Sequence, residues 1–113
     1  MKTVENTLSK KEFKKVAKGD CYHNACEYVL ANKDWTLVHG HPVLQGNSKY
    51  RGMRFGHAWV EKDGVVYDTE ADITIPADLY YAIGQIDKDE VKRYTTEEAR
   101  RNILDRGIWG PWE

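Results

Sequence analysis

A stretch with the sequence of a tight β-hairpin constrains the fold of this chain more than any other segment. Asp63-Gly64 separates two runs, 57–62 and 65–70, that contain Trp, Tyr, Val and Thr. Asp-Gly is typical of a two-residue type I′ turn, because both central residues of that turn need positive φ. The turn predicts the following cross-strand pairs: Lys62 with Val65, Glu61 with Val66, Val60 with Tyr67, Trp59 with Asp68, Ala58 with Thr69, and His57 with Glu70.

The predicted hairpin brings a histidine together with carboxylates. Side chains alternate between the two faces of a strand, so His57, Trp59 and Asp68 are expected on one face. Asp68 lies diagonal to His57 in this register, and Glu70 lies directly across from it. A histidine held by a carboxylate is the orienting half of a nucleophilic triad, and either acid can take that role here.

A candidate nucleophile lies upstream, at the start of a predicted helix. Asp20 is a good N-cap, which places Cys21 at the first helical position. The positive end of the helix dipole favours a thiolate there, and we expect substrate to reach it. Cys26 falls inside the apolar stripe and is expected to be an inert core residue. The stripe that predicts this amphipathic helix consists of Tyr22, Ala25, Cys26, Val29 and Leu30.

The composition is typical of one globular domain over residues 1–113. Hydrophobic residues make up 41% of the chain, which contains four Trp and seven Tyr. The formal net charge is −1 with Lys and Arg dispersed, so neither nucleic acid nor an anionic membrane is an expected partner. The N-terminal residues lack an apolar signal segment, and the two cysteines are poorly placed for a disulfide. These features favour free thiols in a reducing, cytoplasmic setting.

The remaining patterns predict an α+β fold, in which N-terminal helices pack on a three- or four-stranded antiparallel sheet. Two capping boxes, at 9–12 and 95–98, indicate helix starts. The other expected elements are a helix at 10–18, a strand at 35–45 with an edge or bend at Pro42, a helix at 75–84, a strand at 90–94, a helix ending at Gly107, and an aromatic tail at 108–112 that packs back onto the domain.

A helix that begins with a cysteine, followed by strands with a histidine and an acid, resembles the papain-like and transglutaminase-like thiol enzymes. His57-Ala58-Trp59 followed by Asp68-Thr69 is similar to the His-Ala-Trp and Asp-Thr/Ser pattern of the transglutaminase-like group. The short spacing also resembles minimal papain-like bacterial cell-wall peptidases and small phage- or prophage-encoded proteins. The resemblance spans residues 19–69 and implies a papain-like/transglutaminase-like core. It also implies Cys21 as nucleophile, His57 as general base and acid, and Asp68 as orienter.

These residues predict a cysteine-nucleophile enzyme that transfers acyl groups from peptide or protein amide bonds, as a peptidase, amidase, deamidase or transglutaminase-like enzyme. No cofactor is expected. Trp59 is expected either to wall the cleft or to be an ordinary core tryptophan. Gln45 and Asn24 are candidate substrate-binding residues that donate to the oxyanion with the Cys21 backbone N–H. One alternative is a catalytically degenerate papain-like domain that binds a protein partner; another is that Cys21 is an ordinary buried helix residue.

Two further histidines raise the alternative of a zinc site. His39 and His41 alternate on a predicted strand and therefore share a face, as metal ligands can. Cys21, His23 and Cys26 do not have a Cys-x2-Cys spacing, so no metal is expected. His39 and His41 are instead predicted to lie at the rim of the cleft or on the surface.

Overall fold

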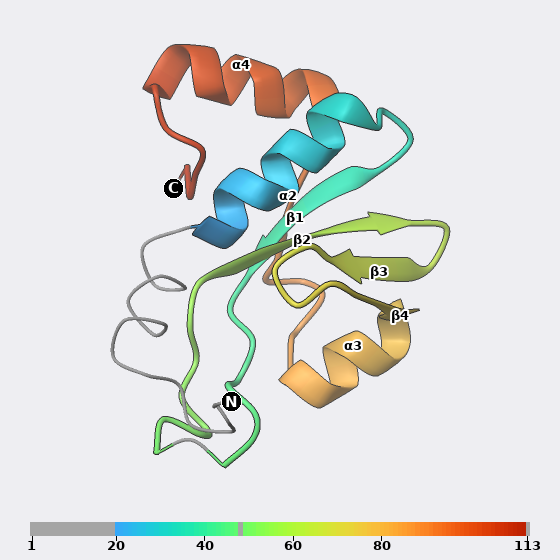
Figure 1. The fold of residues 1–113 in the computed structure, drawn as a ribbon, viewed down its shortest axis with the longest axis vertical. Helices are drawn as coiled ribbons and strands as arrows, with labels where there is room; N and C mark the ends of the chain where they lie inside the picture. The colour runs from blue at the N-terminus through green and yellow to red at the C-terminus, as the bar shows by residue number, and fades with distance from the viewer. Residues whose placement is uncertain (1–19, 48, 113) are drawn as a thin grey trace.

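The computed structural model describes residues 20–47 and 49–112, which form helices on both faces of one sheet (Figure 1). The helix predicted at 10–18 and its capping box lie outside the described residues. The elements in chain order are α2 (Asp20–Ala31), β1 (Thr36–Gly40), β2 (His57–Lys62), β3 (Val65–Asp68), β4 (Ile73–Pro76), α3 (Ala77–Gly84), β5 (Lys92–Tyr94) and α4 (Thr96–Arg106).

The sheet has five strands in the order β4-β3-β2-β1-β5, and every neighbouring pair is antiparallel. The α+β prediction is confirmed, but the expected number of three or four strands is wrong. The strand that the sequence does not predict is β4, whose residues 75–76 are expected to begin a helix. β4 is a mostly exposed edge strand that ends at Pro76, so it lacks the apolar alternation that marks an internal strand.

The hairpin turn forms as predicted, but the strand pairing stops sooner. Asp63 and Gly64 have φ of 51° and 79°, and the pairs nearest the turn have the expected register as far as Val60 with Tyr67. After Asp68 the chain turns away over 69–72 to form β4. The predicted pairing of His57 with Glu70 is therefore wrong, because Glu70 lies in this turn and not on a strand.

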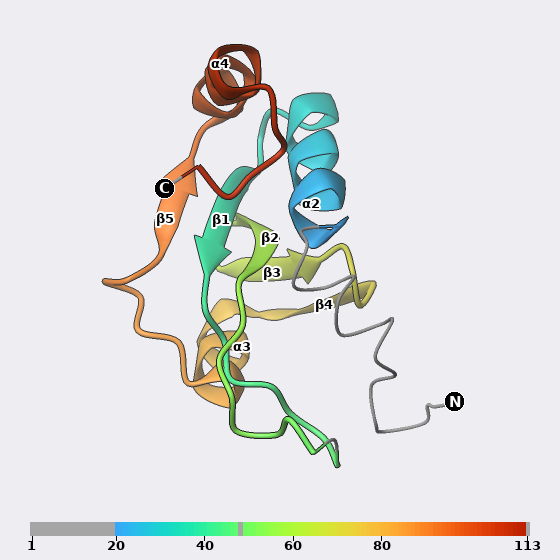
Figure 2. The ribbon, with the colours of Figure 1, turned by 90° about the vertical axis from the view of Figure 1, so that its left-hand side faces the viewer.

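Two hydrophobic clusters cover opposite faces of the sheet. Figures 1 and 2 show α2 running along the sheet with α4 near it, while α3 lies apart from both, close to β4. The first cluster joins α2 and α4 to the inward residues of β1 and β2, and it includes Val29, Leu37, Ala58, Val60 and Ala99. The second cluster packs α3 on the other face, with Val38, Trp59 and Val66 at its centre and Tyr80 and Tyr81 against it.

The first turn of α2 lies tightly against the start of β2. Gly56 makes this contact possible, because a β-carbon there would lie 2.6 Å from the Tyr22 hydroxyl oxygen. The helix already includes Asp20, so Cys21 is its second residue and Asp20 is not the N-cap as expected. An acidic residue inside the first turn still complements the helix dipole.

The strand expected at 35–45 is shorter than predicted, whereas the aromatic tail at 108–112 packs back onto the domain as predicted. β1 ends at Gly40, and beyond Pro42 only an isolated bridge joins Val43 to Arg54. Trp112 is 4% exposed, and its indole N–H donates to the Ile108 carbonyl at 2.9 Å. No helix among the described residues is long and apolar enough to cross a membrane.

Buried His39 is surrounded by aromatic rings. The ring centroids of Tyr22, Tyr94 and Trp112 lie 4.8, 4.9 and 5.2 Å from that of His39. Neither His39 ring nitrogen has a hydrogen-bond partner among the described residues. Burial therefore lowers the pKa of His39 from 6.5 to about 4.

This burial predicts a loss of stability in acid. The folded-state pKa of His39 lies below its unfolded value, so its contribution to stability is present above pH 6.5 and is lost as the pH falls through about 4. Urea unfolding measured across this range should give a free energy of unfolding that declines with falling pH. The decline should be shallower for His39→Leu, and equal slopes in the two proteins would contradict the assignment.

The capping box at the start of α4 provides a second stability test. The Thr95 side chain accepts from the Glu98 N–H at 3.1 Å, and the Glu98 carboxylate accepts from the Thr95 N–H at 2.9 Å. Thr95→Ala should lower the free energy of unfolding by about 1 kcal/mol, because a helix N–H loses its acceptor. In a urea melt, Arg101→Ala on the exposed side of the same helix should change it by less than about 0.5 kcal/mol.

Candidate active site

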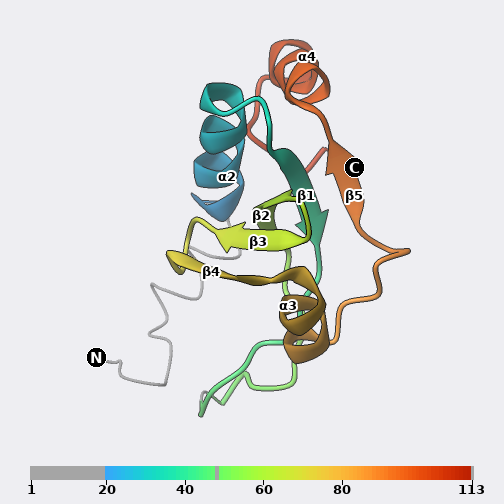
Figure 3. The ribbon, with the colours of Figure 1, turned by 90° about the vertical axis from the view of Figure 1, so that its right-hand side faces the viewer.

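The predicted triad residues meet at one end of the sheet. β2 begins at His57, β3 ends at Asp68, and α2 carries Cys21 in its first turn. Figure 3 shows the start of α2 at the same edge of the molecule as the end of β3. Three elements that are separate in sequence therefore bring together the nucleophile, base and acid expected from the sequence.

Asp68 is the carboxylate that holds His57. His57 Nε2 and Asp68 Oδ2 are 2.8 Å apart, and both residues are 5% exposed. The other Asp68 oxygen accepts from the backbone N–H groups of Glu70 and Ala71 at 3.0 and 3.1 Å. Burial raises the pKa of Asp68, but its hydrogen bonds, above all that with His57, outweigh burial and lower it below its usual value. Of the two acids considered as orienter, Asp68 makes the contact.

Cys21 interacts with the same imidazole ring. Burial of the ring lowers the pKa of His57, but its interactions with Asp68 and Cys21 outweigh burial and raise it to about 9. His57 Nδ1 is buried and has no hydrogen-bond partner among the described residues. Hydrogen bonds in catalytic sites are often long or incomplete before substrate binds. The imidazolium form therefore persists at neutral pH beside the thiol.

The expectation that Cys21 is accessible is wrong, because it has no exposed surface. The first turn of α2 packs directly on β2, which encloses it. Cys26 is also fully buried, as expected for a core residue. Burial, and secondarily the charge of Glu27, raise the pKa of the Cys26 thiol to about 11. The two cysteines are equally buried, but only Cys21 interacts with a histidine.

Trp59 supports His57 from within the core. It is fully buried, its ring centroid lies 6.0 Å from that of His57, and its indole N–H donates to Glu61 Oε2 at 2.8 Å. Trp59 does not line the cavity that reaches His57. Of the two expectations for Trp59, a core tryptophan is confirmed and a cleft wall is wrong, because inward packing on the α3 face covers the indole.

The side-chain amides of Asn24 and Gln45 are already engaged. Asn24 Nδ2 donates to Glu70 Oε1 at 3.1 Å on the surface. Gln45 Nε2 donates to the carbonyls of Val43 and Ile83, at 2.9 and 2.8 Å. Gln45 lines the cavity beside His57, but its N–H groups hold the loop to α3. Neither amide donates toward Cys21 in this arrangement.

Tyr80 also belongs to the site, although the sequence does not predict this role. Its hydroxyl donates to Asp68 Oδ2 at 2.7 Å, the same oxygen that faces His57. Burial and the neighbouring charge of Asp68 raise the pKa of Tyr80, so the phenol stays protonated as a donor. No local pattern separates Tyr80 from an ordinary core tyrosine, because its contact depends on how α3 docks.

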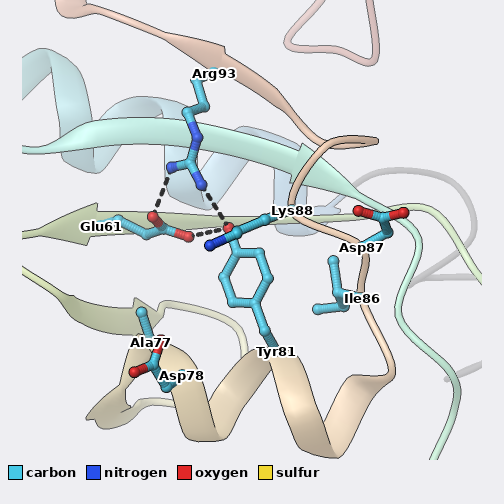
Figure 4. Close-up of a pocket in the computed structure, with 8 residues that line it drawn as sticks. All are labelled: Glu61, Ala77, Asp78, Tyr81, Ile86, Asp87, Lys88 and Arg93. Carbon is cyan, nitrogen blue, oxygen red and sulfur yellow. Dashed lines mark hydrogen bonds and ion pairs between the residues drawn. The ribbon is translucent and has the colours of Figure 1, made fainter.

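A second carboxylate network fixes α3 against the sheet. Figure 4 shows Glu61 of β2 between Arg93 of β5 and Tyr81 of α3. Arg93 Nη1 lies 2.6 Å from Glu61 Oε1, and the Tyr81 hydroxyl donates to Glu61 Oε2. These residues border a cavity of about 410 Å³. The network anchors the turn of α3 that also directs Tyr80 at Asp68.

The cavity that reaches the site opens on the α3 side. It has a volume of about 300 Å³, and His57, Asp68 and Tyr80 line it together with mostly apolar side chains. Cys21 does not line it. His39 and His41 line a different cavity, of about 160 Å³, so neither lies at the rim of the site. The alternative expectation of a surface position is confirmed for the exposed His41 but not for His39, which is 4% exposed. Within the described part of the chain, no group of three or more His, Cys, Asp or Glu residues is arranged to bind a metal.

No protein-family model matches the chain, and neither a curated protein nor a solved structure shows significant similarity to it.

Proposed function

We propose that this protein is a cysteine-nucleophile enzyme that transfers acyl groups from amide bonds through Cys21, His57 and Asp68. The observation that carries the proposal is the buried imidazole of His57, which is hydrogen-bonded to Asp68 through Nε2 and also interacts with Cys21. A papain-like or transglutaminase-like core is part of the proposal. It is supported by a helix-start cysteine packed on an antiparallel sheet that carries the histidine and the acid.

The proposed reaction has two stages. The Cys21 thiolate attacks the amide carbonyl carbon, and His57 donates its Nδ1 proton to the departing amine as the carbon–nitrogen bond breaks. Nδ1 is the nitrogen assigned to proton transfer because Asp68 occupies Nε2. The resulting thioester then reacts with water or an amine, which loses a proton to neutral His57 as the thiolate departs. Hydrolysis and amine transfer differ only in this second nucleophile.

The oxyanion would be stabilised by backbone donors at the start of α2. The first four N–H groups of a helix lack an intrahelical acceptor, and Cys21 lies within that turn. We assign the Cys21 N–H as one donor. The amides of Asn24 and Gln45 would serve as further donors only after leaving their present acceptors. They remain candidate substrate-binding residues.

One observation favours a second candidate, a papain-like domain that binds a protein partner without turnover. Cys21 is fully buried and does not reach the cavity that contains His57. In that case the triad would be a structural polar cluster. The chemical reactivity of Cys21 separates the two candidates.

Thiol labelling tests the proposed nucleophile. Treatment of the folded protein with iodoacetamide at neutral pH should modify Cys21 at least about tenfold faster than Cys26, because only Cys21 has an imidazolium beside it. Peptide mass spectrometry assigns the modified residue.

Two variants control this labelling experiment. His57→Ala should remove the advantage of Cys21, whereas Cys26→Ala should preserve its rate. Since both cysteines are fully buried, accessibility alone predicts equal rates. Equal rates, or faster modification of Cys26, would favour the binding-domain candidate.

The titration of His57 tests its charge environment without any substrate. In the wild-type protein the NMR signals of the His57 ring should titrate with a pKa of about 9. Asp68→Asn should move this pKa well below 9, because the variant loses the carboxylate that stabilises the imidazolium. Glu70→Gln is the matched control, since Glu70 makes its side-chain contact with Asn24. A larger shift in the Glu70 variant would reverse the choice of orienter.

A further inference from the structure

The cavity on the α3 side of the site is formed by three segments. They are the loop between β1 and β2, the turn before β4, and α3 with the residues that follow it. His57 and Asp68 form its polar end, where the Tyr80 hydroxyl also meets Asp68. A group bound in this cavity would therefore lie directly beside the imidazole that transfers the proton.

The walls of the cavity are apolar. Among the described residues that line it, His57 and Asp68 are the only charged groups, and they pair with each other. A charged group entering the cavity would lose its hydration without gaining a counter-charge, which is strongly unfavourable. The apolar wall consists mainly of Val43, Leu44, Phe55, Ile73, Ile83 and Ile86.

Exposure and size indicate what the cavity accommodates. Ile73 and Ile83, which line it, are 43% and 47% exposed, so its mouth is an apolar surface that faces solvent. Its volume of about 300 Å³ lies at the lower end of the range for ligand sites. This size favours one bulky side chain over an extended ligand.

We propose that this cavity selects amide substrates in which an uncharged aliphatic or aromatic amino-acid side chain borders the reacting amide. The role of the cavity in substrate selection rests on the proposed function. Its preference for an uncharged apolar side chain does not, so that preference can be measured by ligand binding without any reaction.

Ligand binding followed by NMR tests the preference directly. The ligands are N-acetyl-leucine amide, N-acetyl-asparagine amide, which has a polar side chain of similar shape, and N-acetyl-lysine amide. The leucine ligand should produce saturable shifts of the His57 ring and the Ile83 methyl signals. It should bind at least roughly tenfold more tightly than the other two. Equal affinities, or no saturable shift with the leucine ligand, would overturn the proposal.

A straight acyl chain is another uncharged apolar group that could occupy the cavity. N-methylhexanamide presents such a chain on an amide without an amino-acid side chain. It should bind more weakly than N-acetyl-leucine amide. Tighter binding of the hexanamide would overturn the assignment to an amino-acid side chain.

A matched pair of variants locates the binding site. Ile83→Asp places a charge at the cavity mouth and should weaken binding of the leucine ligand at least roughly tenfold. Ile108→Asp makes the same chemical change at a residue that is 50% exposed and does not line the cavity, so it should leave that affinity unchanged. Equal effects of the two variants would place the ligand elsewhere.

The binding and labelling experiments have separate outcomes. If N-acetyl-leucine amide binds as expected but Cys21 has no kinetic advantage over Cys26, the cavity is an apolar binding site and the catalytic proposal fails. If Cys21 reacts as expected but the three amino-acid ligands bind equally, only the cavity preference fails.

Discussion

The hydrogen bond between His57 and Asp68 is the contact on which the rest of the site depends. A carboxylate this deeply buried is tolerated only when its oxygens are fully hydrogen-bonded. Asp68 achieves this with His57 and Tyr80 on one oxygen and two backbone N–H groups on the other. The end of β3, the turn at 69–72 and the docking of α3 are thus all needed to keep a single charge in place.

Local chemistry explains which parts of the fold could be predicted. The Asp63-Gly64 turn and the Thr95 capping box depend on residues within a few positions, and both form as expected. The length of the hairpin could not be predicted, because Asp68 pairs with Ile73 of a strand that has no recognisable pattern. An exposed edge strand is stabilised mainly by its neighbour, so its own sequence carries little signal.

The same distinction applies to the candidate site. Strand alternation and the predicted helix start were sufficient to select Cys21 and His57, but they left Asp68 and Glu70 as alternatives, and only the family resemblance favoured Asp68. The packing of Tyr22 depends instead on the close approach permitted by Gly56, and the role of Tyr80 depends on the packing of α3. Such tertiary contacts override local preferences and leave no periodic pattern in the sequence.

The position of α3 is specified by two carboxylates at once. Tyr80 donates to Asp68, and Tyr81 donates to Glu61. Consecutive residues of a helix point about 100° apart, so one turn of α3 reaches both acids only in one rotation and at one height along the sheet. A shift of α3 by a single residue would remove one hydrogen-bond donor from Asp68, which is buried, and one from Glu61, which is half-buried. Loss of a hydrogen-bond donor to a buried carboxylate lowers the stability of the fold. The polar pairs thus fix the register of α3, and its apolar residues can then form the wall of the cavity.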